Sequence, residues 1–344
     1  MSPEIVYVPP NTENTHIIAR AAAMLQRGEL VAFPTETVYG LGANGLDPDA
    51  VARIYAAKGR PAWNPVIVHV ADVSGARALV SQWPQRAQQL ADAFWPGPLT
   101  MVLPKNESVP PIATAGTDTV AVRVPRHPVA LALIRAAGVP LAAPSANRFT
   151  HISPTTAHHV AASLGDRVSL ILDGGPCEVG IESTVVDLSG EHPTILRPGS
   201  ISAAALSDVL HCAVNLRISH RPLASSDDET PARSPGTADR HYAPNADVWL
   251  VDAHNVNEIA SALIERRANN ADARVTALVL GLSVPLSDDD RDIRMPSSPA
   301  MYARALYAAL HDADAAGTTL IVIERPPLLD AWQAVHDRLS RAAL

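Results

Sequence analysis

The sequence predicts an α/β protein in two domains, and three features of its 344 residues support this prediction. Apolar residues make up 47% of the chain, which is enough for a large core, and the length suits two domains better than one. Short β-rich runs alternate with Ala-rich amphipathic runs up to about residue 212, as α/β folds require. A polar stretch then separates this part from a second, shorter α/β pattern.

The first part contains several well-defined expected elements. Strands are expected at residues 30–34, 66–70, 99–103, 120–124, 170–172 and 183–188. The helices expected between them include residues 15–27, 49–57, 128–137 and 155–164. Asp47 followed by Pro48 indicates a helix start, because aspartate caps free N–H groups and proline suits the first turn.

A linker and a second domain are expected after residue 212. The stretch RPLASSDDETPARSP, at 221–235, has no periodicity and is rich in Pro, Ser and Asp, as solvated linkers are. Beyond it, the runs VWLVD, VTALVLGL and TLIVIE are each followed by a helical pattern, at 256–267, 299–316 and 329–342. This order predicts a small Rossmann-like βαβαβα domain with a parallel sheet and right-handed crossovers. The expected divisions are 1–212, a linker at 213–245, and 246–344.

Charge and cysteine content argue against several classes of protein. The formal net charge of −8 disfavours a protein that mainly wraps a polyanion, although a local basic cleft stays open as an alternative. Cys177 and Cys212 are the only cysteines and lack a zinc-ligand spacing, so we expect neither a disulfide framework nor a zinc module. The sequence shows no export signal and no membrane-spanning run, so we expect a soluble, cytoplasmic protein.

The string GLGANG at residues 40–45 matches the G-x-G-x-x-G pattern of dinucleotide-binding turns. We reject that interpretation, because the next helix starts too late and Asp47 would place a carboxylate where the pyrophosphate should bind. The glycines are better interpreted as serving tight turns. P-loop, G-x-S-x-G and H-E-x-x-H patterns are missing, which argues against P-loop NTPases, common serine hydrolases and zincins.

Polar segments follow several apolar runs. PTETVYG at 34–40 follows a buried strand, and ligand sites in open α/β sheets lie at such carboxyl ends. KGRP at 58–61 ends a helix and carries one of only two lysines in the chain, and APSAN at 143–147 follows another apolar strand. Each segment alone also has a structural interpretation: capping threonines at an edge turn, cations that complement a helix dipole, or Ser153 or Thr155 as a helix N-cap.

Taken together, these segments resemble a known family. Residues 14–205 resemble the YrdC/Sua5 family of threonylcarbamoyl-AMP synthases. The resemblance lies in the order and spacing of the motifs PTETVYGLG, KGRP, NPVIVHV, AVRVP, APSAN with ISPT, ESTVVD and LRPG. SPG at 234–236 and HYAP at 241–244 resemble the interdomain motif of the two-domain Sua5 branch, although the acidic stretch 225–229 lengthens the linker here. The resemblance implies a twisted, open, mixed-sheet YrdC-like domain before the Rossmann-like domain.

The resemblance also implies a reaction. L-threonine, bicarbonate and ATP would give threonylcarbamoyladenylate and pyrophosphate, for N6-threonylcarbamoyladenosine formation next to the anticodon of tRNA. The implied partners are the downstream tRNA threonylcarbamoyl transferase complex and, through a weak contact, tRNA itself. Mg²⁺ is expected on the polyphosphate, with no metal ligand from protein side chains.

Individual residues take roles from the same resemblance. Those expected to bind threonine are Thr37, His69, Arg123, Ala143 and Ser183. Those expected to bind ATP are Arg60, Asn64, Thr119, Ser145, Asn147, Ser153 and Arg197, joined from the second domain by His241 or Tyr242. Lys58 and Arg60 are the expected catalytic cations, because phosphoryl-type transfer depends on positioning and electrostatics. The guanidinium fork of Arg123 suits a carboxylate, and no general base is evident.

Two other functions stay open at this point. An RNA-binding module would share a concave, partly basic face, but the net charge of −8 and the 4% aromatic content disfavour it. A carbamoyltransferase of the hydrogenase-maturation type contains a YrdC-like domain, but it also carries zinc-finger cysteines, which two isolated cysteines do not provide.

Overall fold

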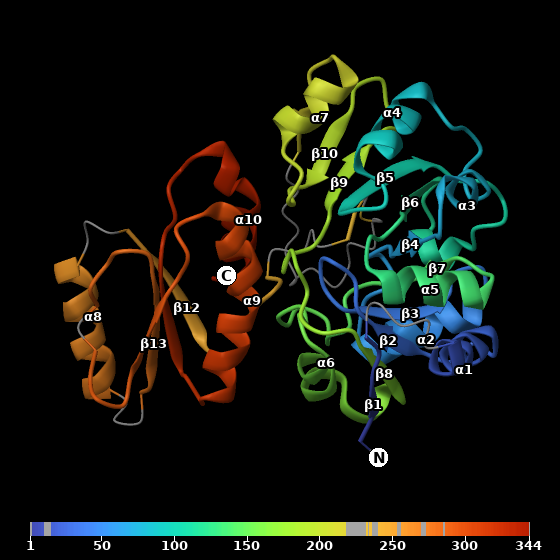
Figure 1. Cartoon of the computed structure of the whole chain (residues 1–344). Helices are drawn as coiled ribbons and strands as arrows, with labels where there is room; N and C mark the ends of the chain where they lie inside the picture. The colour runs from blue at the N-terminus through green and yellow to red at the C-terminus, as the bar shows by residue number, and fades with distance from the viewer. Residues whose placement is uncertain are drawn as a thin grey trace. The chain divides into compact units, whose positions relative to one another are not determined.

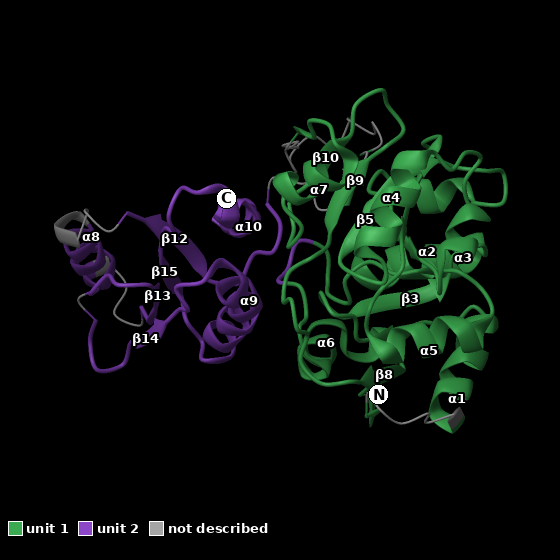
Figure 2. Cartoon of the chain, turned by 45° about the horizontal axis from the view of Figure 1, so that its top comes forward, with its two compact units in different colours: residues 1–149, 153–237 green, residues 150–152, 238–344 purple. Residues whose placement is uncertain are grey.

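A computed structural model describes residues 2–9, 15–217, 232, 234–235, 240–252, 256–269, 273–284 and 286–343. The chain forms two compact units (Figure 2), the first made of Met1–Phe149 and Ser153–Thr237 and the second of Thr150–Ile152 and Ala238–Leu344. Much of the predicted linker, at 218–231, 233 and 236–239, lies outside the described residues. The predicted divisions after residues 212 and 245 therefore stay predictions.

Unit 1 is built on a mixed sheet with the order β1-β8-β2-β3-β7-β4-β6-β5-β9-β10-β11 (Figure 1). The sheet contains parallel pairs, such as β4 with β6, and antiparallel pairs, such as β5 with β6. This sheet confirms the predicted mixed α/β fold. Its strands are β1 (Glu4–Tyr7), β2 (Val31–Phe33), β3 (Gly40–Asn44), β4 (Ile67–His69), β5 (Leu99–Pro104), β6 (Thr119–Arg123), β7 (Leu141–Ala142), β8 (Leu170–Asp173), β9 (Thr184–Asp187), β10 (Thr194–Arg197) and β11 (Asn215–Leu216).

The helix expected to start at Asp47 and Pro48 does start there. Asp47 accepts hydrogen bonds from the backbone N–H groups of Asp49 and Ala50, and Gly59 ends the same helix with φ 61°. Helices α1 and α5 pack side by side (Figure 1) and share an apolar cluster with β2 and β8. The helices are α1 (Thr15–Gln26), α2 (Pro48–Lys58), α3 (Val73–Arg77), α4 (Gln85–Phe94), α5 (Pro128–Ala137), α6 (Ala157–Leu164) and α7 (Ala203–Leu210), with short 3-10 turns at Pro111–Thr114 and Gly165–Arg167.

Successive side chains of the central strands of unit 1 point to opposite faces of the sheet. One face belongs to a large helix-covered core, to which β5 contributes Leu99, Met101 and Leu103. The other face carries a small buried cluster, here called the apolar floor, formed by Ile67, Val102, Ala121, Val185 and Leu196. Since side chains two positions apart point to the same face, His69, Thr100, Arg123 and Ser183 lie on the face of the apolar floor. The alternation of side chains thus places these polar residues on the same face as the apolar floor.

The interpretation of the GLGANG glycines as turn residues is wrong for two of them. Gly40 and Gly42 lie within β3, and only Gly45 lies in the following turn. A Cβ atom at Gly42 would lie 2.7 Å from Cε1 of Phe33, so the absence of a side chain allows β3 to lie against this ring. The pattern therefore serves strand packing.

Unit 2 has a parallel sheet with the order β12-β15-β13-β14, which confirms the predicted parallel sheet. Its elements are β12 (Asp247–Val251), α8 (Val256–Asn269), β13 (Val275–Val279), β14 (Arg291–Arg294), α9 (Pro299–Ala315), β15 (Leu320–Glu324), a 3-10 turn at Asp330–Trp332 and α10 (Gln333–Ala342). The predicted βαβαβα pattern missed β14. This strand reads RDIR and lies at the sheet edge, where charged side chains face solvent and no apolar run marks the strand.

The HYAP segment packs within unit 2. The ring of Tyr242 is 1% exposed, stacks on Tyr307 with 5.8 Å between ring centroids, and lies 5.1 Å from the guanidinium carbon of Arg338. The Asp337 carboxylate accepts hydrogen bonds from Arg338 at 2.6 Å and from Arg341 at 3.1 Å. Tyr242 therefore belongs to the core of unit 2.

We expect Tyr242→Ala to lower the free energy of unfolding of unit 2 by about 3–5 kcal/mol, the usual cost of removing a buried aromatic ring. Amide hydrogen exchange would measure this as faster exchange in β13 and β15, with β5 and β6 of unit 1 unchanged. Tyr242→Phe, which keeps the ring, is the control and should exchange like the original protein. Unchanged protection in the alanine variant would contradict a core role for this ring.

Candidate active site

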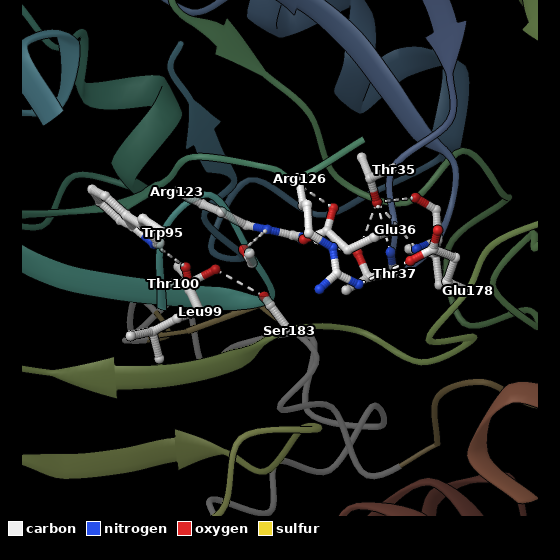
Figure 3. Close-up of polar contacts among 12 residues, drawn as sticks. Thr35, Glu36, Thr37, Trp95, Leu99, Thr100, Arg123, Arg126, Glu178 and Ser183 are labelled. Carbon is white, nitrogen blue, oxygen red and sulfur yellow. Dashed lines mark hydrogen bonds and ion pairs between the residues drawn. The ribbon is translucent and has the colours of Figure 1, made fainter. Parts of the chain in front are cut away.

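Arg123 is the centre of the first group of site residues (Figure 3). Its guanidinium is buried and donates from Nη1 to the Thr37 hydroxyl at 2.9 Å, from Nη2 to Glu36 Oε1 at 2.7 Å and from Nε to the Gly97 carbonyl at 3.2 Å. These contacts bring the PTET segment onto the end of β6. Thr37 and Arg123, two of the residues predicted to bind threonine, are therefore in direct contact.

The PTET segment is held rigidly by its own hydrogen bonds. The hydroxyl of Thr35 accepts from the backbone N–H groups of Thr37 at 3.1 Å and Val38 at 3.2 Å, which closes a local turn. From the opposite side, the N–H groups of Val179 and Gly180 donate to the carbonyls of Glu36 and Thr37 at 2.8 Å and 3.1 Å. The threonine-rich motif therefore fixes its own backbone and presents Glu36 and Thr37 to Arg123.

His69 lies beside Arg123, because strands β4 and β6 pair these two residues in register. Burial, followed by the positive charge of Arg123, lowers the pKa of His69 to about 3. The imidazole is therefore neutral near pH 7. Its Nδ1 atom is buried and has no hydrogen-bond partner among the described residues, so a ligand could supply one.

Ser183 and Arg197 extend this group along β9 and β10. The Ser183 hydroxyl lies 2.8 Å from the Thr100 hydroxyl and accepts from Arg197 Nη2 at 3.1 Å. A register shift in β10 between Ile195 and Arg197 accompanies this arrangement, as bulges commonly redirect side chains. The Arg197 guanidinium also donates to the carbonyls of Ser183 and Pro235.

The second group of site residues gathers at the end of α2. Lys58 is buried, and its ammonium donates to the carbonyls of Ser145 and Asn147. Burial is the main cause that lowers the pKa of Lys58 well below its usual value; the charge of Arg60 adds to the effect and Glu182 opposes it. Lys58 thus does more than complement a helix dipole, because it ties α2 to the APSAN segment.

Arg60 and Asn64 form a buried pair beside Lys58. Arg60 Nη2 donates to Asn64 Oδ1 at 2.6 Å and to the Pro65 carbonyl at 2.6 Å, while Nε donates to the Asn64 carbonyl at 3.0 Å. Asn64 is completely buried, and its Nδ2 atom has no hydrogen-bond partner among the described residues. A buried amide donor of this kind fits a ligand acceptor.

Ser153 bonds to Glu182, whose charge also acts on Lys58. Ser153 is completely buried and donates to Glu182 Oε1 at 2.5 Å, next to Ser183 in the chain. The interpretation of Ser153 or Thr155 as the cap of α6 is wrong, because Thr156 caps this helix by accepting from the His159 N–H group. Since capping does not explain the burial of Ser153, its hydrogen bond to Glu182 supports a role in the site.

Five predicted residues remain: Thr119, Ala143, Ser145, His241 and Tyr242. Ala143 is buried, with its N–H donating to the Ile67 carbonyl at 3.0 Å, whereas Ser145 and Thr119 are half-buried. His241 and Tyr242 belong to unit 2, so their role toward ATP stays a prediction.

Buried residues of this region to which the sequence analysis assigned no role include Glu36, Thr100 and Glu182. Glu36 and Glu182 lie inside the motifs PTET and ESTVVD, but carboxylates are unexpected in a site for anionic ligands. Thr100 could have been noticed as a lone hydroxyl in the apolar run LTMVL. Two of these three residues thus lie inside the motifs, and the sequence analysis did not identify their hydrogen-bond partners.

Two general findings concern the described part of the chain. It contains no group of three or more His, Cys, Asp or Glu side chains arranged to hold a metal ion. Within the same residues, every helix is too short or too polar to cross a membrane.

Comparisons with known proteins agree with this geometry. Residues 23–199 match the family model for Sua5, YciO and YrdC, described as "Telomere recombination", and residues 201–344 match "Threonylcarbamoyl-AMP synthase, C-terminal domain". Threonylcarbamoyl-AMP synthase of Pyrococcus abyssi is 42% identical over 94% of this chain and 93% of its own length. The Bacillus subtilis protein of the same name is 41% identical over 95% and 92%, respectively.

A solved structure supports the same relationship along both units. P. abyssi Sua5 complexed with L-threonine has a TM-score of 0.87 and 39% identity to this chain, and the match covers 99% of this chain and 97% of that one. The chain therefore belongs to the threonylcarbamoyl-AMP synthase family, in its two-domain Sua5 form.

Proposed function

We propose that this chain makes L-threonylcarbamoyladenylate from L-threonine, bicarbonate and ATP and releases pyrophosphate, for N6-threonylcarbamoyladenosine formation in tRNA next to the anticodon. The observation that carries the proposal is the pair of buried polar groups in unit 1, one around Arg123 and one around Lys58. Glu182 precedes Ser183 in the chain, and its charge acts on Lys58. The names of the relatives and the threonine bound to P. abyssi Sua5 support the same assignment.

Threonine fits the group around Arg123. Each terminal guanidinium nitrogen carries two hydrogens and uses one of them on Thr37 or Glu36, so one hydrogen on each remains for the substrate carboxylate. The hydroxyls of Thr37 and Ser183 and the backbone at Ala143 complete the threonine site. A neutral His69 can accept a hydrogen bond from the amine or the hydroxyl of the substrate.

ATP fits the group around Lys58. The ammonium uses two hydrogens on carbonyls, which leaves one for a phosphate oxygen. The adjacent anion would restore the charged form of Lys58, because an opposite charge offsets desolvation. Arg60 and Arg197 add positive charge. The polar side chains expected to complete the ATP site are those of Asn64, Thr119, Ser145, Asn147 and Ser153.

The chemistry follows from these positions. The neutral threonine amine reacts with bicarbonate to give a carbamate and water. A carbamate oxygen then attacks the α-phosphorus while pyrophosphate leaves. Negative charge grows on the phosphoryl oxygens, and fixed cations in a dry site stabilise it. Mg²⁺ bound to the polyphosphate would add to this stabilisation, with phosphate oxygens and water as its expected ligands.

The segment between the units is proposed to close over the nucleotide, from Ser234 to Pro244. Within unit 1, Ser234 is buried and the Pro235 carbonyl accepts from Arg197, one of the expected ATP residues, which supports the proposal. Closure would protect the mixed anhydride from water. The cytoplasmic product would then pass to the tRNA threonylcarbamoyl transferase complex, with at most a weak contact between this chain and tRNA.

Lys58→Ala should lower adenylate formation by about a hundredfold or more, the scale for removing a donor to transition-state charge. Arg60→Ala should act in the same direction, with a further loss because Asn64 loses its partner. Pyrophosphate release is the measurement. Lys105→Ala removes the only other lysine, which contacts the Val109 carbonyl, and serves as the matched control with near-normal activity. Normal turnover in both the Lys58 and Arg60 variants would refute these assignments.

Serine should be the best wrong substrate. It keeps the hydroxyl and lacks only a methyl group, so discrimination against it should be about 1–3 kcal/mol in kcat/KM. Valine should be rejected much more strongly, because it leaves the buried polar groups of the pocket without a partner. Pyrophosphate release with each amino acid measures the ranking, and equal use of valine and threonine would contradict it.

A further inference from the structure

Glu36 is a buried carboxylate in the middle of the Arg123 group, and the proposed reaction gives it no role. Its side chain is 1% exposed and forms an ion pair with Arg123, which is 4% exposed. Oε1 accepts from Arg123 Nη2 at 2.7 Å, and Oε2 accepts from the backbone N–H of Arg126 at 3.0 Å. Burial opposes the charged carboxylate, but the charge and hydrogen bond of Arg123 outweigh it and lower the pKa of Glu36.

The position of this carboxylate is fixed by hydrogen bonds within the protein. The Glu36 carbonyl accepts from Val179 N–H, and the Thr35 turn holds the residues that follow. The Arg123 backbone is equally rigid, since it lies in β6 between β4 and β5. Two rigid backbone segments thus determine where the two charges meet (Figure 3).

We propose that Glu36 is a positioning residue for threonine: it fixes the plane of the Arg123 guanidinium and offsets its charge, so that the remaining N–H groups meet the substrate carboxylate. This inference rests on the proposed function, because it takes threonine as the ligand of Arg123. Substrate affinity then depends on the orientation of Arg123 and not on long-range attraction by an uncompensated cation. Buried ion pairs often serve specificity in this way at a cost in desolvation.

Glu178 offers a matched comparison near the same loop. It pairs with Arg126 at 2.9 Å, but the side chains are 66% and 54% exposed. Exposed pairs of this kind contribute little, because solvent screens them. Glu36 and Glu178 therefore pair with Arg123 and Arg126, respectively, and only the pair of Glu36 with Arg123 is buried.

The test compares Glu36→Gln with Glu178→Gln. In either amide orientation, glutamine at position 36 turns an NH₂ group toward Arg123 or toward the Arg126 N–H, so one hydrogen bond is lost. We expect the KM for threonine to rise about tenfold or more, the scale of one lost hydrogen bond to a charged group. The KM for ATP should stay within about twofold, and Glu178→Gln should leave both constants within about twofold.

A double-variant cycle separates positioning from general damage. Once Arg123 is replaced in Arg123→Gln, adding Glu36→Gln should not raise the KM for threonine further, because Glu36 acts through Arg123. This double variant also removes both buried charges, so it should fold even if a single variant does not. If Glu36→Gln is unfolded by circular dichroism, Glu36→Asp keeps the charge, withdraws the carboxylate by one methylene, and should raise the threonine KM alone.

The outcomes separate this inference from the proposed function. If the unmodified chain releases no pyrophosphate with threonine, bicarbonate and ATP, the proposed function fails. If it does so, but the position 36 variants keep the threonine KM, or raise both KM values equally, Glu36 does not position Arg123. The proposal would also be overturned if Glu36→Gln and Arg123→Gln raised the KM for threonine independently, so that their fold-changes multiplied in the double variant.

Discussion

The burial of charged side chains is the constraint on which the rest of unit 1 depends. Arg123, Arg197, Lys58 and Arg60 are each at most 8% exposed, and a buried cation without partners would cost several kcal/mol. Arg123, Arg197 and Lys58 therefore bond to oxygen atoms from other segments, and Arg60 bonds to oxygen atoms of Asn64 and Pro65 nearby in the chain. The fold has to bring those segments together for the charges to be tolerated at all.

This requirement explains the composition of the motifs. Threonine and serine in PTET and ESTVVD supply short hydroxyls that satisfy buried donors, whereas APSAN supplies backbone carbonyls to Lys58. Glycine in LRPG allows a close approach. A Cβ at Gly199 would lie 2.3 Å from the Thr184 nitrogen, so the chain after Arg197 passes β9 too closely for any side chain. The apolar floor beneath these groups keeps their surroundings poor in water, which strengthens each polar contact.

Local signals predicted the local elements well. Helix α5 was expected at residues 128–137 and has those bounds, because Pro128 opens it and Gly138, with φ 67°, ends it. Apolar runs in the sequence likewise predicted the positions of strands β5, β6 and β8. Strand β3 was missed because its glycines resemble turn residues, and β14 because an exposed edge strand needs no apolar pattern.

The site was predicted less completely, because its contacts join distant segments. The motifs identified Arg123, Lys58 and Ser153, but the sequence alone does not reveal that Glu36 pairs with Arg123, 87 positions away, or that Ser153 bonds to Glu182. Likewise, the HYAP pattern drew attention to Tyr242, whereas its ring packs on Tyr307 and Arg338 inside unit 2. Motifs identify reactive groups, and tertiary structure decides their partners.

The most direct measurement is a mass-resolved assay of the purified full-length chain with ATP, labelled bicarbonate and L-threonine. We predict that the chain releases pyrophosphate and forms an adenylate that carries the bicarbonate label. Neither product should form when threonine or bicarbonate is omitted. An AMP product without the label, or pyrophosphate release independent of threonine, would contradict the central claim that the Arg123 and Lys58 groups form one synthase site.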